Sequence, residues 1–229
     1  MARKTVKKAS KKLTKDPKKL IYVFCEGESE ITYINQLKNV FKKVAVLRPE
    51  KAMIPELKSM FKPSACHEGE ESEIDEIWFF FDIEDVDRVT HWESWKKTLQ
   101  EFSKGRKTSN IKIRLLMTTA CVEYWFLLHY QKTTQPIKSS ADKNHVSQEL
   151  SKFIPSYKKA DRGAISEIAS NYTTALKNGA WTLQQIPEYT QIQTDDWLER
   201  DSWLFMCNYT FTTVHEAINH LEELSKNTK

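Results

Sequence analysis

Apolar and polar positions alternate in blocks along the first 130 residues of the chain. Continuously apolar runs predict buried strands at residues 20–25, 77–81 and 111–117, with a weaker strand at 43–47. Apolar positions at helical spacing predict helices at residues 31–41, 54–61, 88–102 and 122–130. Strands that alternate with helices favour a parallel sheet, because each parallel crossover needs a long connection. The pattern therefore predicts an α/β fold with a mostly parallel sheet flanked by helices.

The pattern changes after residue 142. No convincing strand follows, and helical periodicity returns at residues 146–154, 164–176 and 214–224. An acidic loop at residues 64–76 is expected to be exposed. We therefore expect three parts: a tail over residues 1–19, an α/β domain over residues 20–135, and a helical portion over residues 136–229 that packs on that domain.

The basic charge of the chain is concentrated in its tail. The chain has 229 residues, 40% of them hydrophobic, which is enough to bury a core. Its first 20 residues hold nine Lys or Arg against one acid, Asp16, and lack apolar periodicity, so they are expected to be disordered. Lys7, Lys8, Lys11 and Lys12 are candidates for contacts to nucleic-acid phosphates. A solubilising tail and an attraction to an acidic partner are the alternatives.

Missing motifs exclude several classes of protein. The four cysteines are isolated, which argues against a structural zinc site and a disulfide framework. No apolar run approaches the roughly 20 residues that span a membrane, and the basic N-terminus lacks the apolar segment of a secretory signal. No GxxxxGK[ST] motif occurs, which excludes a P-loop nucleotidase. We therefore expect a cytoplasmic protein that does not enter a membrane and does not itself hydrolyse nucleotides through a P-loop.

Acidic residues follow two of the predicted strands. They are Glu26, Glu28 and Glu30 after the first strand, and Asp82, Glu84, Asp85 and Asp87 after the strand at 77–81. In open α/β sheets, ligands bind beyond the carboxyl ends of the strands, so the two clusters are expected to meet there. Carboxylates without nearby His or Cys suit hard cations such as Mg²⁺. The alternative is that these acids lie in solvated turns and at helix N-termini, where the helix dipole favours them.

These acidic blocks resemble a known domain. The segment CEGESE, with Asp82 and Glu84 closing a second strand, resembles the Toprim domain, which has a Glu after its first strand and a DxD motif after a later one. More narrowly, VFCEGESEITYINQL, IDEIWFFFDIED, TTACVEYWFLLHY, IPSYKK and TFTTVHEAINHL are similar to blocks of the bacterial RloB family, which includes the AbiL-type abortive-infection proteins. The blocks occur in the same order and cover most of the chain after the tail. The resemblance implies a bacterial protein with a Toprim-like sheet.

The resemblance also implies roles for the acidic residues. In Toprim enzymes the Glu that matches Glu26 acts as general acid or base, and the acids of the DxD motif hold Mg²⁺, with Mn²⁺ as the alternative ion. Here Glu84 replaces the second Asp, and Asp85 is a rival ligand. Glu26 is also a candidate metal ligand, and Glu30 is a further candidate catalytic residue.

Two other blocks contribute candidates. The match at CVEYWFLLHY implies that Glu123 lies near the site, without giving its role. His129 is a candidate for proton transfer or phosphate contact, although a His among large apolar residues is more often a hydrogen-bonded core residue. Lys158 and Lys159, in the IPSYKK match, are candidate phosphate contacts, and a solvated helix edge is their alternative.

Together these features favour a metal-dependent nuclease that hydrolyses RNA, including tRNA, or DNA as the effector of an anti-phage defence system. The RloB resemblance implies a separate ATPase, RloA-like, encoded alongside. One alternative is a non-catalytic Toprim-fold adaptor that binds nucleic acid or regulates the ATPase. Another is a phosphotransfer or nucleotidyl-transfer enzyme using the same metal. The oligomeric state stays open, with a homodimer among the options.

Overall fold

The structure is a computed structural model that describes residues 17–62, 64–65, 67–84, 88–105, 107–192, 194 and 196–227. Most of the expected tail, including Lys7, Lys8, Lys11 and Lys12, lies outside the described residues, as does Asp85. The predictions made for those positions therefore stay predictions.

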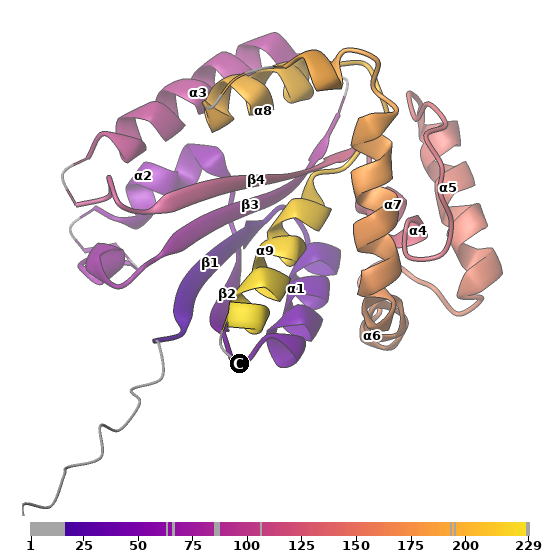
Figure 1. Cartoon of the computed structure of the whole chain (residues 1–229), viewed down its shortest axis with the longest axis horizontal. Coiled ribbons are helices and arrows are strands. Elements are labelled where there is room, and N and C mark those ends of the chain that lie inside the picture. Colours follow the sequence, from indigo (N-terminus) through magenta and orange to yellow (C-terminus); the bar gives the residue numbers. More distant parts are fainter. Residues whose placement is uncertain are drawn as a thin grey trace, which may run out of the picture.

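A four-stranded parallel sheet forms the centre of the fold (Figure 1). Its strands are β1 (Lys19–Cys25), β2 (Ala45–Lys51), β3 (Glu76–Ile83) and β4 (Lys112–Thr119), in the order β2-β1-β3-β4. β1 and β3 are the central pair, and Cys25 at the end of β1 lies opposite Phe80 of β3. The predicted α/β fold with a parallel sheet is confirmed.

The side chains of β3 alternate between two hydrophobic clusters, one on each face of the sheet. Trp78 and Phe80 enter the first cluster, and Ile77, Phe79 and Phe81 enter the second. All five side chains are fully buried. The uninterrupted apolar run therefore marks a strand that is covered on both faces, as its composition predicted.

Helices cover both faces of the sheet. The α-helices are α1 (Glu28–Val40), α2 (Leu57–Met60), α3 (Arg88–Ser103), α4 (Val122–Leu127), α5 (Ser140–Phe153), α6 (Arg162–Ser170), α7 (Tyr172–Gln184), α8 (Trp197–Met206) and α9 (Val214–Asn227), and the 3-10 helices are η1 (Ile54–Glu56), η2 (Glu70–Ser72) and η3 (Tyr189–Gln191). α1 and α9 pack on the face of Trp78 and Phe80, whereas α3 and α8 pack together over the opposite face (Figure 1). α4 to α7 gather at one end of the sheet, on the right in Figure 1. None of the helices in the described ranges is long and apolar enough to cross a membrane.

The helical C-terminal portion differs from the prediction in two places. The single helix expected at residues 164–176 is wrong, because the chain breaks at Asn171, which ends α6 and begins α7. α8 was not expected. Its apolar positions are split by Glu199, Arg200 and Asp201, which hides the periodicity that the other helices display.

The expectation of an exposed acidic loop is also wrong in part. Glu71 is buried, and Glu70 accepts a hydrogen bond from the Tyr22 hydroxyl and contacts His67 Nδ1 at 3.2 Å. Asp75 accepts a hydrogen bond from Lys19 Nζ at 2.7 Å. Glu70 and Asp75 of the loop therefore contact side chains of β1, whereas Glu68 and Glu73 of the same loop are exposed.

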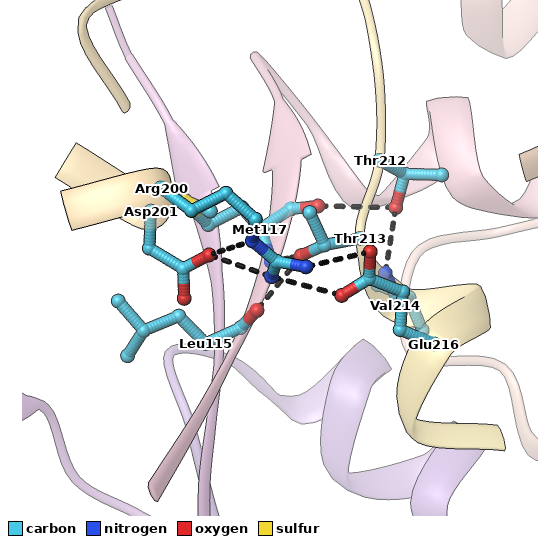
Figure 2. Close-up of polar contacts among 8 residues, drawn as sticks. All are labelled: Leu115, Met117, Arg200, Asp201, Thr212, Thr213, Val214 and Glu216. Carbon is cyan, nitrogen blue, oxygen red and sulfur yellow. Dashed lines mark hydrogen bonds and ion pairs between the residues drawn. The ribbon is translucent and has the colours of Figure 1, made fainter. Parts of the chain in front are cut away.

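A C-terminal segment covers part of the outer edge of β4 through side-chain hydroxyls (Figure 2). Thr213 Oγ1 accepts a hydrogen bond from the Met117 N–H at 2.8 Å and donates one to the Leu115 carbonyl at 2.7 Å. Thr212 Oγ1 donates to the Met117 carbonyl at 3.0 Å. These bonds satisfy backbone groups that an edge strand otherwise leaves unpaired.

An ion-pair network joins the two last helices beside that edge (Figure 2). Arg200 of α8 contacts Asp201 at 2.7 Å and Glu216 of α9 at 2.9 Å. The end of the chain is thus attached to the sheet and to α8, so the helical portion packs on the α/β domain at several points.

Candidate functional site

The candidate site lies where the carboxyl ends of β1 and β3 meet. β1 continues through α1 to β2 on one side, and β3 continues through α3 to β4 on the other side. In open α/β sheets this reversal of strand order leaves a crevice at the carboxyl ends of the two central strands. The acidic residues that follow β1 and β3 are therefore brought to the position where such folds bind ligands.

Glu26 connects the ends of the two strands directly. Its backbone N–H donates a hydrogen bond to the Phe80 carbonyl at 3.2 Å, which extends the β1–β3 pairing by one step. Its Oε2 accepts a hydrogen bond from the Asp82 N–H at 3.1 Å. Glu26 is exposed, so its carboxylate is open to solvent beside Asp82.

Glu30 lies in the first turn of α1 and is 3% exposed. Its Oε2 is buried and has no hydrogen-bond partner. Burial raises the pKa of the Glu30 carboxyl, and the charges of Glu26 and Glu123 raise it further, although its own backbone N–H and Lys159 act in the opposite direction. A Cβ at Gly27 would lie 2.9 Å from that Oε2, so a larger residue there would displace the Glu30 carboxylate.

Asp82, near the end of β3, shares two properties with Glu30: an unpartnered buried oxygen and a raised pKa. Its Oδ1 is buried without a hydrogen-bond partner. Burial raises the pKa of the Asp82 carboxyl well above its usual range, and Glu30, Glu26 and Glu123 add to the shift by repulsion. The charges of Glu26 and Glu123 raise the pKa of both Glu30 and Asp82, and we call these four residues the acidic cluster: Glu26, Glu30, Asp82 and Glu123.

Glu123 joins the cluster from the first turn of α4. It is 7% exposed, and its Oε1 accepts a hydrogen bond from the Tyr157 hydroxyl at 3.1 Å. Tyr157 belongs to the loop between α5 and α6, and Ser29 Oγ of α1 holds this loop by accepting a hydrogen bond from the Ala160 N–H at 3.0 Å. The loop is therefore attached both to Glu123 and to the helix that carries Glu30.

The same loop brings positive charge to the cluster. Lys158 and Lys159 are both exposed. The charge of Lys159 opposes the upward pKa shifts of Glu30 and Asp82, which places its ammonium group within electrostatic reach of both. Lys159 is thus a cation whose charge acts on both unpartnered carboxylates, Glu30 and Asp82.

Glu84 is placed differently from the other acids. It is exposed, and its Oε1 contacts Lys143 Nζ of α5 at 2.6 Å. The structure therefore brings Glu26, Glu30, Asp82 and Glu123 together and pairs Glu84 with a lysine.

His129 lies in the core. It is 1% exposed, with Nδ1 3.0 Å from the Trp125 carbonyl and Nε2 3.0 Å from the Tyr33 hydroxyl. The Nδ1 must donate to the carbonyl, so the Nε2 accepts from Tyr33. Burial lowers the pKa of the His129 ring to about 3, although its hydrogen bonds act in the opposite direction. Both ring nitrogens are satisfied, which favours the core interpretation over a catalytic one.

The cluster fits a hard cation in some respects. Among the described residues, no group of three His, Cys, Asp or Glu side chains forms a ready-made metal site. Mg²⁺, however, commonly takes only one or two carboxylates and completes its coordination with water and substrate phosphate. The unpartnered oxygens Glu30 Oε2 and Asp82 Oδ1 are the kind of hard ligand that such an ion prefers.

Three residues of this region were not identified from the sequence as part of the site. Tyr157 and Ser29 lie inside blocks that were recognised, next to Lys158 and Glu30, but nothing in their spacing signals a contact with Glu123 or with the loop. Lys143 lies 59 positions from Glu84, and no local pattern connects them. Such contacts depend on how α4, α5 and the loop pack.

Comparison with known proteins supplies one match. The sequence model of one protein family, described as RloB-like protein, matches residues 21–221. No curated protein and no solved structure matches the chain. The matched range contains every residue of the acidic cluster and both lysines of the adjoining loop.

Proposed function

The chain belongs to the family of RloB-like proteins, and on that premise we propose that it is a metal-dependent nuclease with a Toprim-like site. Its proposed role is that of the effector of a bacterial abortive-infection defence system of the AbiL type. The proposed substrate is RNA, including tRNA, or DNA.

One observation carries this proposal: two buried carboxylate oxygens, Glu30 Oε2 and Asp82 Oδ1, have no hydrogen-bond partner. Leaving buried polar atoms unpaired costs about 1–3 kcal/mol each, and more when they are charged. Repulsion within the acidic cluster adds to this cost. A divalent cation would relieve both costs at once, which is a reason for a fold to keep such a site.

The residues of the cluster suit different parts of phosphodiester hydrolysis. Asp82, with help from Glu26 and Glu30, would hold the cation, Mg²⁺ or Mn²⁺. When bound, that ion polarises a phosphoryl oxygen and lowers the pKa of water. Glu26 is exposed and can take the proton that the attacking water loses as its oxygen bonds to phosphorus and the bond to the leaving nucleotide breaks. Glu30, with its raised pKa, is the second candidate for proton transfer.

Lys159 and Glu123 would assist without exchanging protons. The exposed ammonium group of Lys159 would neutralise a phosphate that enters beside Glu30 and Asp82. Tyr157 fixes the Glu123 carboxylate through its hydroxyl and would keep it oriented toward the cluster.

A cleavage assay tests the proposal. The purified full chain is incubated with tRNA, single-stranded RNA and duplex DNA, each with Mg²⁺, Mn²⁺ or a chelator. We expect cleavage of at least one substrate that requires the ion and is lost in Glu26→Gln and Asp82→Asn. Glu28→Gln is the matched control, because Glu28 is an exposed carboxylate in the same first turn of α1. Cleavage that survives both site substitutions would contradict the proposal.

A non-catalytic adaptor is the second candidate, and a specific observation favours it. The described residues contain no three-ligand metal group, and Glu84 is engaged by Lys143 instead of lying open for a cation. Such an adaptor would bind nucleic acid or regulate a partner ATPase. Binding of nucleic acid without any ion-dependent cleavage would support it.

The proposal includes a separate RloA-like ATPase encoded alongside. The sequence has no P-loop motif, so nucleotide hydrolysis through that motif has to come from another chain. Co-purification of the two proteins from cells that express both would support the partnership, and full toxicity of this chain in cells lacking the ATPase would argue against it.

A further inference from the structure

We propose that a groove along α5 binds a single strand of nucleic acid and leads it to the acidic cluster, an inference that rests on the proposed function. The groove, called here the α5 groove, is open to solvent and has a volume of about 620 Å³. Glu123 and Tyr157 line it on the side of the cluster. Lys158 and Lys159 also line it.

The α5 wall of the groove is polar but uncharged. Asn144, Ser147, Gln148 and Ser151 all line the groove, and their spacing of three or four residues places them on one face of the helix. Ser147 and Ser151 donate their hydroxyl hydrogens to carbonyls four residues earlier, at 3.3 and 2.8 Å, which leaves their oxygens as acceptors. Within the described part of the chain, the side-chain amides of Asn144 and Gln148 have no hydrogen-bond partner, so their donors face the groove or water.

The acids of α5 are kept away from this wall. Asp142 and Glu149 line a different cavity, together with His145 and the segment before the helix. Among the described residues that line the groove, Glu123 is the one carboxylate, beside amides, hydroxyls and two lysines. This segregation of charge matches a phosphate backbone better than it matches a basic partner.

The groove is connected to the candidate site at two points. Lys143, next to Asn144 on α5, contacts Glu84 just after β3. Lys159, which also lines the groove, acts electrostatically on Asp82. A strand lying in the groove would thus have its phosphates delivered to the carboxyl end of β3.

The dimensions favour a single strand. The volume is within the range of about 300–1,000 Å³ of pockets that hold drug-sized molecules, which leaves room for one or two nucleotides. Asn144 to Ser151 spans about 10 Å along the helix, which is long enough for one or two nucleotides of a single strand. A double helix, whose major groove alone is about 12 Å wide, would have to remain outside.

Binding of a fluorescent 12-nucleotide single strand to the full chain, measured in chelator to prevent cleavage, tests the inference. RNA and DNA strands are compared with the corresponding duplexes. Gln148→Glu places a carboxylate on the wall and should weaken single-strand binding about fivefold, because of repulsion by phosphate at the protein surface. Lys158→Ala should reduce the slope of log K against log salt by about 0.7, as expected for one lost phosphate contact on a single strand.

Gln184→Glu is the matched control, because it makes the same change at an exposed helical position of α7 that does not line the groove. It should leave the affinity unchanged. Equal effects of the two glutamates, preference of the wild type for duplex, or no binding of single strands by the wild type would each overturn the inference. A Gln148→Glu variant that binds nucleic acid normally but no longer co-purifies with an ATPase would overturn it in favour of a protein-docking groove.

The groove and the nuclease can fail separately. If Gln148→Glu weakens binding while the wild type never cleaves with Mg²⁺ or Mn²⁺, the groove stands and the nuclease proposal falls. If the wild type cleaves and Gln148→Glu binds and cleaves single strands equally well, the nuclease proposal stands and the groove falls.

Discussion

β3 carries a buried carboxylate oxygen near each of its ends, and the fold treats the two in opposite ways. At the amino end, Glu76 accepts hydrogen bonds from Trp78 Nε1 at 2.9 Å and Arg114 Nε at 2.7 Å. His220 Nε2 of α9 lies 2.7 Å from its other oxygen. Burial alone raises the pKa of Glu76, but these partners outweigh burial and lower the pKa to about 2.

At the carboxyl end of the same strand, Asp82 lies among other acids, and both Lys159 and Lys143 are within its electrostatic reach. Its Oδ1 has no hydrogen-bond partner, and its pKa is raised well above the usual range by burial and by the repulsion of the cluster. The pKa shifts at the two ends therefore have opposite signs. The fold stabilises the charged form of Glu76 and destabilises the charged form of Asp82.

The difference is consistent with a structural role for Glu76 and with the ligand-binding role proposed for Asp82. A buried charge that serves the fold is surrounded by donors, as Glu76 is. A buried charge that lacks donors lowers stability and is retained where a ligand can supply the missing interaction. The acids with raised pKa values, Glu30 and Asp82, lie at the edge of the sheet where open α/β folds bind ligands, which supports the proposed site.

The largest expected effect comes from removing the structural carboxylate. Glu76→Ala leaves Arg114 without its partner and should lower the free energy of unfolding by about 3–5 kcal/mol, measured by urea denaturation. Glu73→Ala, at an exposed position of the preceding loop, should change it by less than about 0.5 kcal/mol. A loss below about 1 kcal/mol for Glu76→Ala would remove the contrast between the two ends.

The pH dependence of wild-type stability is a second test of the contribution that the Glu76 carboxylate makes to folding. Because the pKa of Glu76 is depressed, its contribution is complete above the unfolded value of about 4.3 and is lost as pH falls towards about 2. Glu76→Ala should lack that part of the acid transition.

The next effect tests the carboxyl end with metal. If the cluster binds a divalent cation, Mg²⁺ or Mn²⁺ should stabilise the wild type by RT ln(1 + [L]/Kd), which is about 2.7 kcal/mol at 100 times Kd. Asp82→Asn should show little of this rise in a thermal melt, whereas Glu28→Gln should keep it. Equal stabilisation of Asp82→Asn and wild type would show that the ions act elsewhere.

Without metal, the sign for Asp82→Asn should reverse. Removing a repelled buried carboxylate should raise the free energy of unfolding at neutral pH by about 0.5–2 kcal/mol, opposite to the effect at Glu76. Between the unfolded pKa of about 3.9 and its raised folded value, Asp82 holds its proton only in the folded state, so stability falls as pH rises. Asp82→Asn should flatten that fall in chelator, and an unchanged pH profile would contradict the assignment.

The smallest expected effect concerns the loop that borders the cluster. Tyr157→Phe removes the hydroxyl that donates to Glu123 and should lower the free energy of unfolding by about 1 kcal/mol. Tyr209→Phe, at an exposed tyrosine, is the matched control and should be neutral. Equal stabilities of the two variants in urea denaturation would indicate that the bond to Glu123 contributes nothing measurable.

The fold was predictable where the local pattern and the packing agree. The apolar run at 77–81 and the helical spacing at 88–102 correspond closely to β3 and α3, because a strand buried on both faces and a helix with one apolar face leave distinct periods in the sequence. α8 was missed because Arg200 and Asp201 interrupt its apolar run. Arg200 is explained by its partner Glu216 on α9, which no local pattern signals, and Asp201 pairs with Arg200.

The residues of the candidate site were likewise predictable from the sequence only in part. The sequence by itself determined that acids follow two buried strands and that no P-loop is present, since both are local facts of order and composition. Only the tertiary structure decided which acids are buried without partners, that Glu84 is paired with Lys143, and that His129 is a core residue. The reason is physical: burial and pairing depend on neighbours brought in by other helices, over separations such as the 59 positions between Glu84 and Lys143, which no local pattern encodes.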